Sequence, residues 1–484
     1  MKRTLSACAV VLGLVAAGCG SVAGSGTLDP AALAPANTLA YASFEIAPQG
    51  PQKEGFDAAF GKLLGSGPEQ KLGQAFTEAA RTGASLDYAA DVKPWLGGTI
   101  SAVVTRVGRE HCDYALLVAS TDDAKARAAI DKDLAGAHAT TRDYRGVPYM
   151  ALGDGTANGV VDHFLVAGTE AAFKAVVDTA KDGQSLAGSE QWKTSVGSRA
   201  DGKVGLGYVD LKGVLQSLAS GLPGVQRVAA PLLLGLVQIH PFVATLDATP
   251  NSLVVDISSP GTKPDPRGPA AASSPLIEQM PADAWAALAL PKVGQALGQL
   301  ATALKANPLI GAQYGRVVAS VRARTGIDLE KDVLAAVGDV GVFVRGSLPK
   351  AVGGAIVVQS PRPATLARTM RKLRRLVPPA VQLRSSGGRA VAAYGVAAMR
   401  DAQHPQGRLG DTDLFRKAAA SVGERPTFFM AAAAALHVAA GSPHHRGDKR
   451  FQQALPHLQH LEYLAVGARR EGELDVVRAV LGLR

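Results

Sequence analysis

The chain has 484 residues, a formal net charge of +10 at pH 7, 5% aromatic residues and three cysteines. A chain of this length can bury a large hydrophobic core and is expected to form more than one domain. The positive charge alone would favour nucleic acid, but the aromatic side chains on which bases stack are too few, so we exclude nucleic acid as the expected partner.

The first residues are typical of an export signal. A basic start precedes a short apolar segment, Leu5–Val15, and small residues then lead into Cys19. The apolar segment is too short to span a membrane stably. A small-residue run that ends in cysteine resembles the bacterial lipobox, in which the cysteine is acylated, for example with palmitate, and becomes the new N-terminus. Ala16 stands where lipoboxes usually have leucine, so ordinary cleavage nearby is the alternative.

We therefore expect residues 1–19 to be a lipoprotein-type signal peptide, with Cys19 as the lipid anchor. The mature protein would be exported and held at the outer face of the cytoplasmic membrane. Residues 20–34 are rich in Gly, Ser, Ala and Pro. They predict a flexible tether in which nothing packs.

The cysteine count agrees with this address. Cys8 leaves with the signal and Cys19 would carry lipid, so Cys112 is alone in the mature chain and no internal disulfide can form. We interpret Cys112, which lies beside an apolar run, as a small core residue and not as a nucleophile. An exported protein without disulfides has to be stabilised by its core alone.

Strand and helix patterns alternate along the chain. Residues 39–46 ("LAYASFEI") alternate as a strand does, and apolar residues at helical spacing follow up to Leu64. An Ala-rich helix is predicted after Asp122, because acidic residues suit a helix N-terminus. Hairpins are predicted at 99–120, 138–153 and 242–258. Hairpins with helices inserted between them favour an α+β fold with a mainly antiparallel sheet covered by helices.

One stretch of sequence occurs nearly twice: "DVKPWLGGTISAVV" begins at Asp91 and "DVLAAVGDVGVFV" begins at Asp332. Other pieces recur in the same order, with an offset that falls slowly from 246 (281 − 35) to 223 (409 − 186). The matched positions are Pro35 with Pro281, Arg81 with Arg324, Asp91 with Asp332, Ser120 with Ser360, and Leu186 with Leu409. Five collinear pairs indicate an internal duplication.

The duplication predicts two tandem homologous lobes. The first α+β repeat would cover residues 35–259, and a shortened second repeat would cover residues 277–484. Residues 260–276, rich in Pro, Gly and Ser, would be the linker. We expect the second copy to lack a counterpart to much of residues 159–181, which read as a strand and a helix.

Three stretches together resemble the bacterial domain of unknown function 3352, found in envelope proteins of actinobacteria and their relatives. They are "PANTLAYASFEIAPQGPQKEGF", "DVKPWLGGTISAVV" and "QSLAGSEQWKTSV". The resemblance would cover nearly all of the mature chain. It implies an exported, membrane-attached protein, and it brings no known reaction or ligand.

The two repeats differ in the sign of their charge. Residues 30–260 contain 19 Lys and Arg against 24 Asp and Glu, a balance of −5. Residues 276–484 contain 28 against 15, a balance of +13. The surplus of positive charge therefore belongs to the second repeat.

Part of that surplus lies on one predicted helix, residues 363–377. Its apolar stripe consists of Leu366, Met370, Leu373 and Val377. Its opposite face presents Arg368, Arg371, Lys372 and Arg375. This basic face could rest on anionic lipid headgroups, with each side chain near the surface contributing about 1 kcal/mol. The alternative is a solvated helix face without a partner.

Motifs that resemble catalytic signatures do not survive inspection. "GSRADGKV" (197–204) has the spacing of a phosphate-binding loop, but Val204 replaces the magnesium-binding Ser or Thr and a strand follows. "SLPK" (347–350) lacks the helix start that penicillin-binding enzymes use. We therefore predict no catalytic residue, no cofactor and no enzymatic activity.

Four histidines near the C-terminus are candidate zinc ligands. His457 and His460 could share a helix face, and His444 and His445 could complete the shell. No acidic residue or cysteine is fixed nearby by a motif, and the specific spacing of a strong zinc signature is absent. A mobile loop is the alternative.

Two apolar runs could line a ligand site. Residues 228–246 ("VAAPLLLGLVQIHPFVATL") are interrupted by Pro, Gln and His, so they do not read as a membrane span. With residues 428–439 ("FFMAAAAALHVA") they could line an apolar crevice between the lobes, although tight helix packing explains the alanines equally well.

The sequence thus predicts a membrane-anchored extracytoplasmic lipoprotein with a non-enzymatic binding or scaffolding role in the cell envelope. Anionic lipid or an envelope protein are the candidate partners. The first alternative is a carrier of lipid or another apolar ligand. The second is a hydrolase, which would need converging polar side chains with perturbed pKa values in a cleft.

Overall fold

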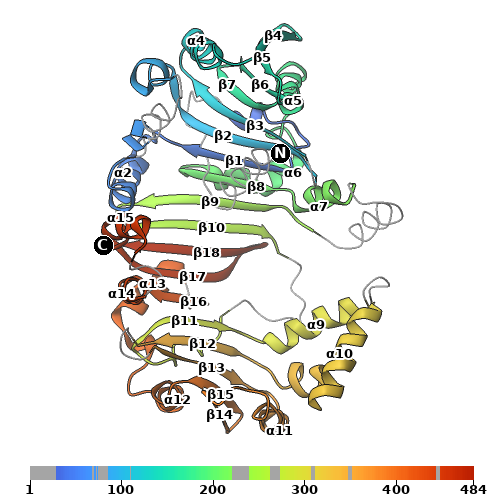
Figure 1. The fold of residues 1–484 in the computed structure, drawn as a ribbon, viewed down its shortest axis with the longest axis vertical. Helices are drawn as coiled ribbons and strands as arrows, with labels where there is room; N and C mark the ends of the chain where they lie inside the picture. The colour runs from blue at the N-terminus through green and yellow to red at the C-terminus, as the bar shows by residue number, and fades with distance from the viewer. Residues whose placement is uncertain are drawn as a thin grey trace. The chain divides into compact units, whose positions relative to one another are not determined.

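The computed structural model describes residues 29–67, 70–71, 73–74, 86–108, 111–220, 239–261, 273–306, 311–346, 352–423, 425–442 and 447–484. The signal peptide with Cys19 lies outside the described residues. Contacts divide the chain into two compact units (Figure 1). Unit 1 comprises residues up to Gly261 together with Gly472–Val476, and unit 2 comprises the remainder. The division at Gly261 falls inside the range expected to be a linker.

Unit 1 is built on an antiparallel sheet whose spatial order is β4-β5-β6-β7-β3-β2-β1-β8-β9-β10. Its strands are β1 (Ala40–Glu45), β2 (Leu96–Val107), β3 (Cys112–Ser120), β4 (Ala139–Tyr144), β5 (Val147–Leu152), β6 (Thr156–Val161), β7 (Phe164–Thr169), β8 (Gly205–Val209), β9 (Phe242–Thr249) and β10 (Ser252–Pro260). The predicted hairpins are β2–β3, β4–β5 and β9–β10, and each prediction is confirmed.

Several helices of unit 1 begin at a residue whose side chain caps the first turn. They are η1 (Pro30–Ala32), α2 (Pro51–Leu64), η2 (Tyr88–Val92), α4 (Asp123–Leu134), α5 (Glu170–Asp182), α6 (Glu190–Ser195), η3 (Gly197–Ala200) and α7 (Leu211–Ser220). The side chain of Asp122 accepts a hydrogen bond from the Lys125 amide, and Thr169 does the same for Ala172. Each cap satisfies a free N–H group of the first turn.

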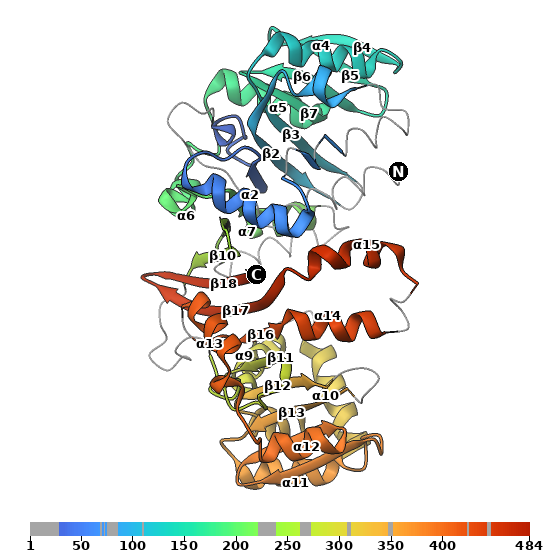
Figure 2. The same ribbon diagram turned by 90° about the vertical axis from the view of Figure 1, so that its left-hand side faces the viewer.

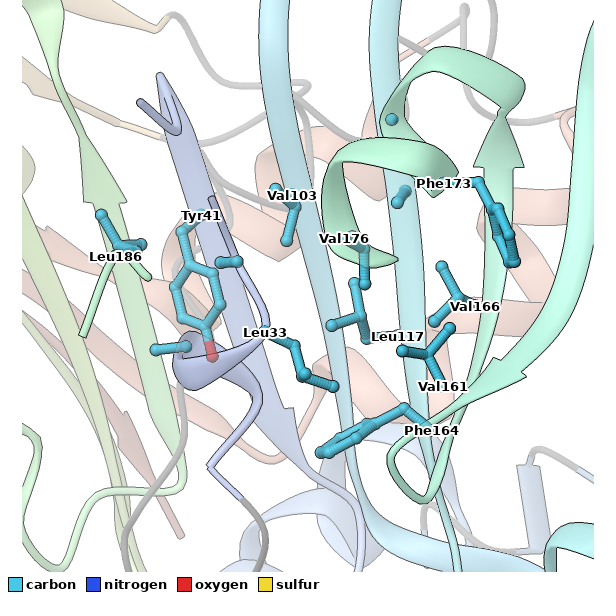
Figure 3. Packing of buried hydrophobic residues seen from close by; sticks show 14 of the residues in the cluster. Leu33, Tyr41, Val103, Leu117, Val161, Phe164, Val166, Phe173, Val176 and Leu186 are labelled. Carbon is cyan, nitrogen blue, oxygen red and sulfur yellow. The ribbon is translucent and has the colours of Figure 1, made fainter. Parts of the chain in front are cut away.

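The main core of unit 1 lies between the sheet and α5 (Figure 3). Leu117 and Val166 point from the strands toward Phe173 and Val176 of α5, and all four side chains are buried. The spacing of buried residues on α5 follows the helical period, which is what places one face on the sheet. This core removes large apolar side chains from water, which is the main source of stability expected for unit 1.

The end of the expected tether belongs to this core, which corrects the prediction for residues 29–34. Asp29 caps η1, and Ala31, Leu33 and Ala34 are buried. The amide of Leu186 donates to the carbonyl of Ala34 at 2.7 Å. Apolar side chains that can reach a core are more stable there than in water, so a Pro- and Ala-rich composition did not keep this segment free.

Unit 2 is also an antiparallel sheet with helices, in the spatial order β14-β15-β13-β12-β11-β16-β17. Its strands are β11 (Ala284–Leu290), β12 (Val340–Arg345), β13 (Gly353–Gln359), β14 (Val381–Ser386), β15 (Arg389–Tyr394), β16 (Phe428–Ala431) and β17 (Leu461–Glu471). The last strand, β18 (Leu474–Leu483), has its first residues in unit 1. The predicted α+β class with an antiparallel sheet is confirmed.

The helices of unit 2 lie around the strand ends and against parts of both faces. They are α9 (Val293–Ala306), α10 (Gly311–Thr325), η4 (Leu329–Leu334), α11 (Pro363–Leu373), α12 (Val396–Gln403), η5 (Leu409–Asp411), α13 (Asp413–Val422), α14 (Ala432–Gly441) and α15 (Lys449–Leu458). In Figure 1, α9 and α10 lie at one end of β11–β13, and α13 and α14 lie at the other. No helix among the described residues is long and apolar enough to cross a membrane.

The shorter second unit differs from the first by a hairpin. Four strands, β4 to β7, lie between α4 and α5, whereas only β14 and β15 lie between α11 and α12. In unit 1 the helix α5 follows β7, and in unit 2 the helix α12 follows β15. The expected loss of a strand and helix matching residues 159–181 is therefore wrong, because no sequence match between Ser120 and Leu186 anchored the comparison.

Candidate functional site

A row of apolar side chains crosses the sheet of unit 2. In the strand register Leu288 lies opposite Val342, Val342 opposite Ile356, Ile356 opposite Ala392, and Ala392 opposite Leu383. Phe428 and Val466 extend the row onto β16 and β17. Directly opposed residues of antiparallel strands project to the same face. We call the face that carries this row the open face.

The open face is poorly covered at its centre. Ile356 lies on β13, which is paired on both sides, and yet its side chain is 47% exposed. Tyr394 on β15 is 61% exposed. An interior strand normally buries its apolar residues, so the exposure of Ile356 makes the open face a candidate binding surface.

The opposite face of the same strands is a complete core. Phe343, Ala355 and Ala393 alternate with the open-face residues and are at most 4% exposed. Ala398 and Met399 of α12 are buried as well, and α12 packs against β13 and β15. On these central strands α12 therefore covers one face, while the middle of the other face is left exposed.

Helices reach the open face only at its borders. At one border Leu366 and Met370 of α11 pack with Ala336, Val358 and Ala390. At the other border α14 packs beside β11, β16 and β17. Figure 2 shows α13 and α14 to either side of β16. The middle of the open row lies between these borders.

The predicted basic helix is α11, and its apolar stripe is confirmed at Leu366 and Met370. Arg368 and Arg371 are exposed, and Arg375 is exposed beyond the helix end. These three residues can meet a partner from solvent, as the sequence predicts.

Lys372 does not belong to that exposed set. Its Nζ donates to the carbonyl of Gly326 at 2.6 Å and pairs with Asp332 of η4 at 3.1 Å. The pKa of Asp332 is lowered, first by a hydrogen bond from the Asp328 amide and then by Lys372. Lys372 therefore links α11 to η4, and its assignment as a lipid contact is corrected. A helical wheel could not reveal a partner 40 residues away.

Positive charge is concentrated where the chain borders the open face. Residues 359–400 contain no Asp or Glu. Their basic residues are Arg362, Arg368, Arg371, Lys372, Arg374, Arg375, Arg384, Arg389 and Arg400. Within the described part of the chain only Lys372 and Arg400 of these form ion pairs. The sequence shows this run directly, but the strand register was needed to place it beside an apolar face.

A hollow of about 320 Å³ lies at the free edge of β14. Arg374 and Arg384 line it together with Val381 and Leu383, and two prolines, Pro378 and Pro379, complete its wall. Leu383 is also the last member of the open row. The hollow thus joins the basic segment to the apolar face.

The predicted zinc ligands are not brought together by the described residues. His444 and His445 lie outside them. His457 ends α15 half-buried, and the exposed His460 follows in a turn in which its amide donates to the His457 carbonyl. Within the described ranges no three metal-ligating side chains are grouped.

Unit 1 contains an apolar pocket of about 320 Å³ that sequence analysis missed. It lies between η2, α4 and the sheet, and Trp95, Ile130 and Leu165 are among its walls. Asn158 and Asp133 are its polar members. Trp95, in "KPWLGG", was the available signal, because a tryptophan has a large apolar side chain that is usually packed against other residues.

A larger hollow of about 840 Å³ lies in unit 2 between α9, η4 and the ends of the strands. Three of its four charged side chains, those of Lys305, Glu330 and Asp339, are already engaged. Lys305 binds Glu330, and Asp339 accepts hydrogen bonds from Ser274 and from the amide of Lys292. These bonds link the ends of the strands, and they leave few charged groups available to a ligand.

Glu45 is the acidic residue with the largest upward shift among those described. Burial raises its pKa to about 7, and a hydrogen bond from Thr99 at 3.1 Å opposes the rise. Gly98 approaches the carboxylate so closely that a Cβ there would collide with it. Glu45 lines none of the three hollows above, so its titration concerns the stability of unit 1.

The remaining predicted segments are placed as follows. Residues 228–238 and the "SLPK" motif lie outside the described residues. Phe428 and Met430 belong to β16, and the alanines after them form α14. Cys112 is half-buried and packs beside Ala40, Ala102 and Val104.

A family model described as a protein of unknown function, DUF3352, matches residues 4–387. No curated protein matches the chain. Two solved structures are similar over 78% of this chain and 97% of theirs: crystal form III of TP0453, with 8% identity and a TM-score of 0.22, and crystal form I, with 9% identity and a TM-score of 0.19. TM-scores this low carry no argument about function.

Proposed function

We propose a function from the premise that the chain belongs to the DUF3352 family, whose description assigns no activity. The protein would be an exported, lipid-anchored component of the cell envelope, with a non-enzymatic binding role. Its binding surface would be the open face of unit 2. The observation that carries this proposal is the half-exposed Ile356 at the centre of an apolar row.

Burying a large aliphatic side chain is worth about 1.5–3 kcal/mol, and the open row leaves much of this unrealised. A ligand or partner that covers the row would recover it. Contiguous exposed apolar surface on a soluble unit is otherwise a liability for aggregation.

The open face is tested with a solvatochromic apolar dye and two matched variants. Ile356→Asn places a polar group at the centre of the row and should reduce dye binding several-fold. Val317→Asn makes the same kind of change at a 59% exposed position on α10, and it should leave binding unchanged. Equal binding by wild type and Ile356→Asn would refute the proposal.

The anchor is proposed from the sequence around Cys19. Its test is metabolic labelling with an alkynyl palmitate, followed by fractionation of the cells. The wild-type chain should incorporate label and remain with membranes, whereas Cys19→Ala should do neither. A labelled Cys19→Ala chain would show that the anchor is elsewhere.

We also propose that the two units are copies of one ancestral unit. Strands β1, β2, β3, β7 and β8 of unit 1 pair in the same pattern as β11, β12, β13, β15 and β16 of unit 2. A shared ion pair supports the same conclusion: Lys132 of α4 binds Asp91 of η2, as Lys372 of α11 binds Asp332 of η4.

The shared ion pair includes its cap. Asp87 caps the short π-helix η2, and Asp328 caps the short π-helix η4. The backbone amide of each donates to the aspartate four residues later, Asp91 or Asp332. An experimental structure in which the two sets of five strands fail to superimpose in order would refute the duplication.

A carrier of an apolar ligand is the second candidate, and the pocket beside Trp95 favours it. Native mass spectrometry of the extracted protein should then show a bound apolar molecule that is lost in Ala129→Trp, which fills the pocket. A hydrolase has less support, because Glu45 is remote from the hollows described.

A further inference from the structure

The open row ends at positive charge. Leu383, its last residue on β14, lines the hollow that also contains Arg374 and Arg384. Both guanidinium groups are exposed. Among the described residues neither has a carboxylate partner, and Arg384 reaches only the side-chain oxygen of Gln403 at 3.4 Å. Their charge is available to a ligand.

The acidic side chains on the neighbouring elements are already engaged. Residues 360–400 supply α11, β14 and β15, and none of them is Asp or Glu. On α12, whose Gln403 is reached by Arg384, Asp401 pairs with Arg345 and Arg400. On η4, Asp332 is engaged by Lys372 and Glu330 by Lys305. An anion in the hollow would therefore meet an uncompensated positive field.

The length of the row sets the size of the apolar part. Its members on β14, β15, β13, β12 and β11 span four strand spacings, which amounts to about 19 Å. That distance is comparable to an extended long-chain acyl group. The width favours a single chain, since the adjacent positions Val358 and Ala390 already lie against α11.

We propose that the open face binds a single-chain anionic amphiphile, a long-chain carboxylate, with its head in the hollow of Arg374 and Arg384. The chain lies across Leu383, Ala392 and Ile356 toward Leu288. Guanidinium groups bind carboxylates with two parallel hydrogen bonds, so the head is held as well as attracted. This inference rests on the proposed binding role of the open face.

The test uses the whole chain with Cys19→Ala, so that no anchor acyl group competes for the face. The probe is cis-parinaric acid, a fluorescent long-chain fatty acid, and its methyl ester is the uncharged comparison. The wild-type face should bind the acid saturably and at least tenfold more tightly than the ester. Equal affinities would overturn the proposed head site and leave the apolar binding role intact.

Two double variants locate the head site. Arg374→Gln with Arg384→Gln should weaken binding of the acid about tenfold and leave the ester unchanged. Arg316→Gln with Arg324→Gln removes the same charge from exposed positions on α10, and it should have no effect. An equal loss in both double variants would show general attraction by net charge and overturn the inference.

The apolar part and the source of the ligand are tested separately. Ile356→Asn should weaken the acid and the ester alike. If wild type binds neither probe, the proposed function of the open face fails together with the inference. Binding of phosphatidylglycerol vesicles that persists in the Arg374 and Arg384 double variant and is not displaced by the free acid would identify a membrane surface as the partner, and it would overturn the single-chain assignment.

Discussion

The central strands pair in the same pattern in both units, but one face of the sheet is covered to a different extent in each unit. In unit 1 the row Ala42, Ala102, Leu116 and Ala167 holds the position that Leu288, Val342, Ile356 and Ala392 hold in unit 2. Ala42 and Ala102 are buried and Leu116 and Ala167 are half-buried, whereas no member of the unit 2 row is buried and Ile356 is exposed. The corresponding face is thus covered more completely in unit 1 than in unit 2.

The difference arises from the covering elements and from residue size. In unit 1, α7 packs beside β2, and Ser217 both donates to and accepts from the backbone of Val107. In unit 2 the row has larger side chains and lies beside the acid-free, basic segment. Exposed apolar side chains with positive charge beside them are the basis of the proposed binding surface.

Substitution in the covered core should have the largest effect. Leu117 on β3 is fully buried between the sheet and α5. Leu117→Ala removes buried methyl groups and leaves a cavity, and we expect a loss of about 2–5 kcal/mol in the free energy of unfolding. Chemical denaturation checks this value. A loss below that of an exposed substitution would mean that this face of unit 1 is not packed as described.

The next largest expected effect is on the pH dependence of the free energy of unfolding, and it is confined to unit 1. Burial raises the pKa of Glu45 to about 7, so the folded state holds its proton more tightly than the unfolded state does. The resulting stability is complete below pH of about 4.5, the ordinary pKa, and is lost as the pH rises through about 7.

Glu45→Gln should remove this dependence and stabilise the chain above pH 7 by an amount on the order of 1–2 kcal/mol, allowing for the partial exposure of the carboxyl group. Thermal unfolding at pH 5 and pH 8 measures it. Since the amide can still accept from Thr99, the variant isolates the charge. Parallel pH profiles for wild type and variant would contradict the assignment.

A smaller effect is expected where α7 is attached to the sheet. Ser217→Ala removes both hydrogen bonds to Val107, and a lost hydrogen bond costs about 1 kcal/mol. Hydrogen exchange should rise in α7 and at the end of β2, and unit 2 should be unchanged. Ser220→Ala, on the exposed side of α7, is the matched control.

Local patterns explain which elements the sequence predicted. Residues 39–46 alternate with a period of two and form most of β1, and two β-rich runs within residues 99–120 form the β2–β3 hairpin. Asp122 predicted the start of α4, because a capping side chain bonds to an amide within the first helical turn. The stripe of α11 was readable for the same reason. Each signal depends on neighbours a few residues apart.

Non-local contacts explain the failures. "GGAIVVQ" is apolar on both faces of β13, so no periodicity could tell that Ala355 is buried and Ile356 exposed. The ion pair of Lys372 depends on Asp332, far away in sequence. Asp29–Ala34 joined a core built by residues over a hundred positions later. The candidate site therefore needed the strand register before it could be recognised.

The smallest expected loss of stability tests whether the open face of unit 2 is uncovered. Ile356→Ala removes the same kind of side chain as Leu117→Ala, from the strand that holds the position of β3 in the shared pairing pattern. Because Ile356 is 47% exposed, much less apolar area returns to water, and we expect a loss of no more than about 1 kcal/mol.

Denaturant midpoints of the two alanine variants, measured side by side, give the comparison directly. A loss for Ile356→Ala as large as that for Leu117→Ala would mean that something in this chain covers the face, and a binding role there would be excluded. A small loss, combined with reduced binding of the fatty acid probe, separates stability from function at one residue. A substitution that reduces binding with little loss of stability is expected only of an exposed side chain that contacts a ligand, because a core residue cannot lose its contacts without destabilising the fold.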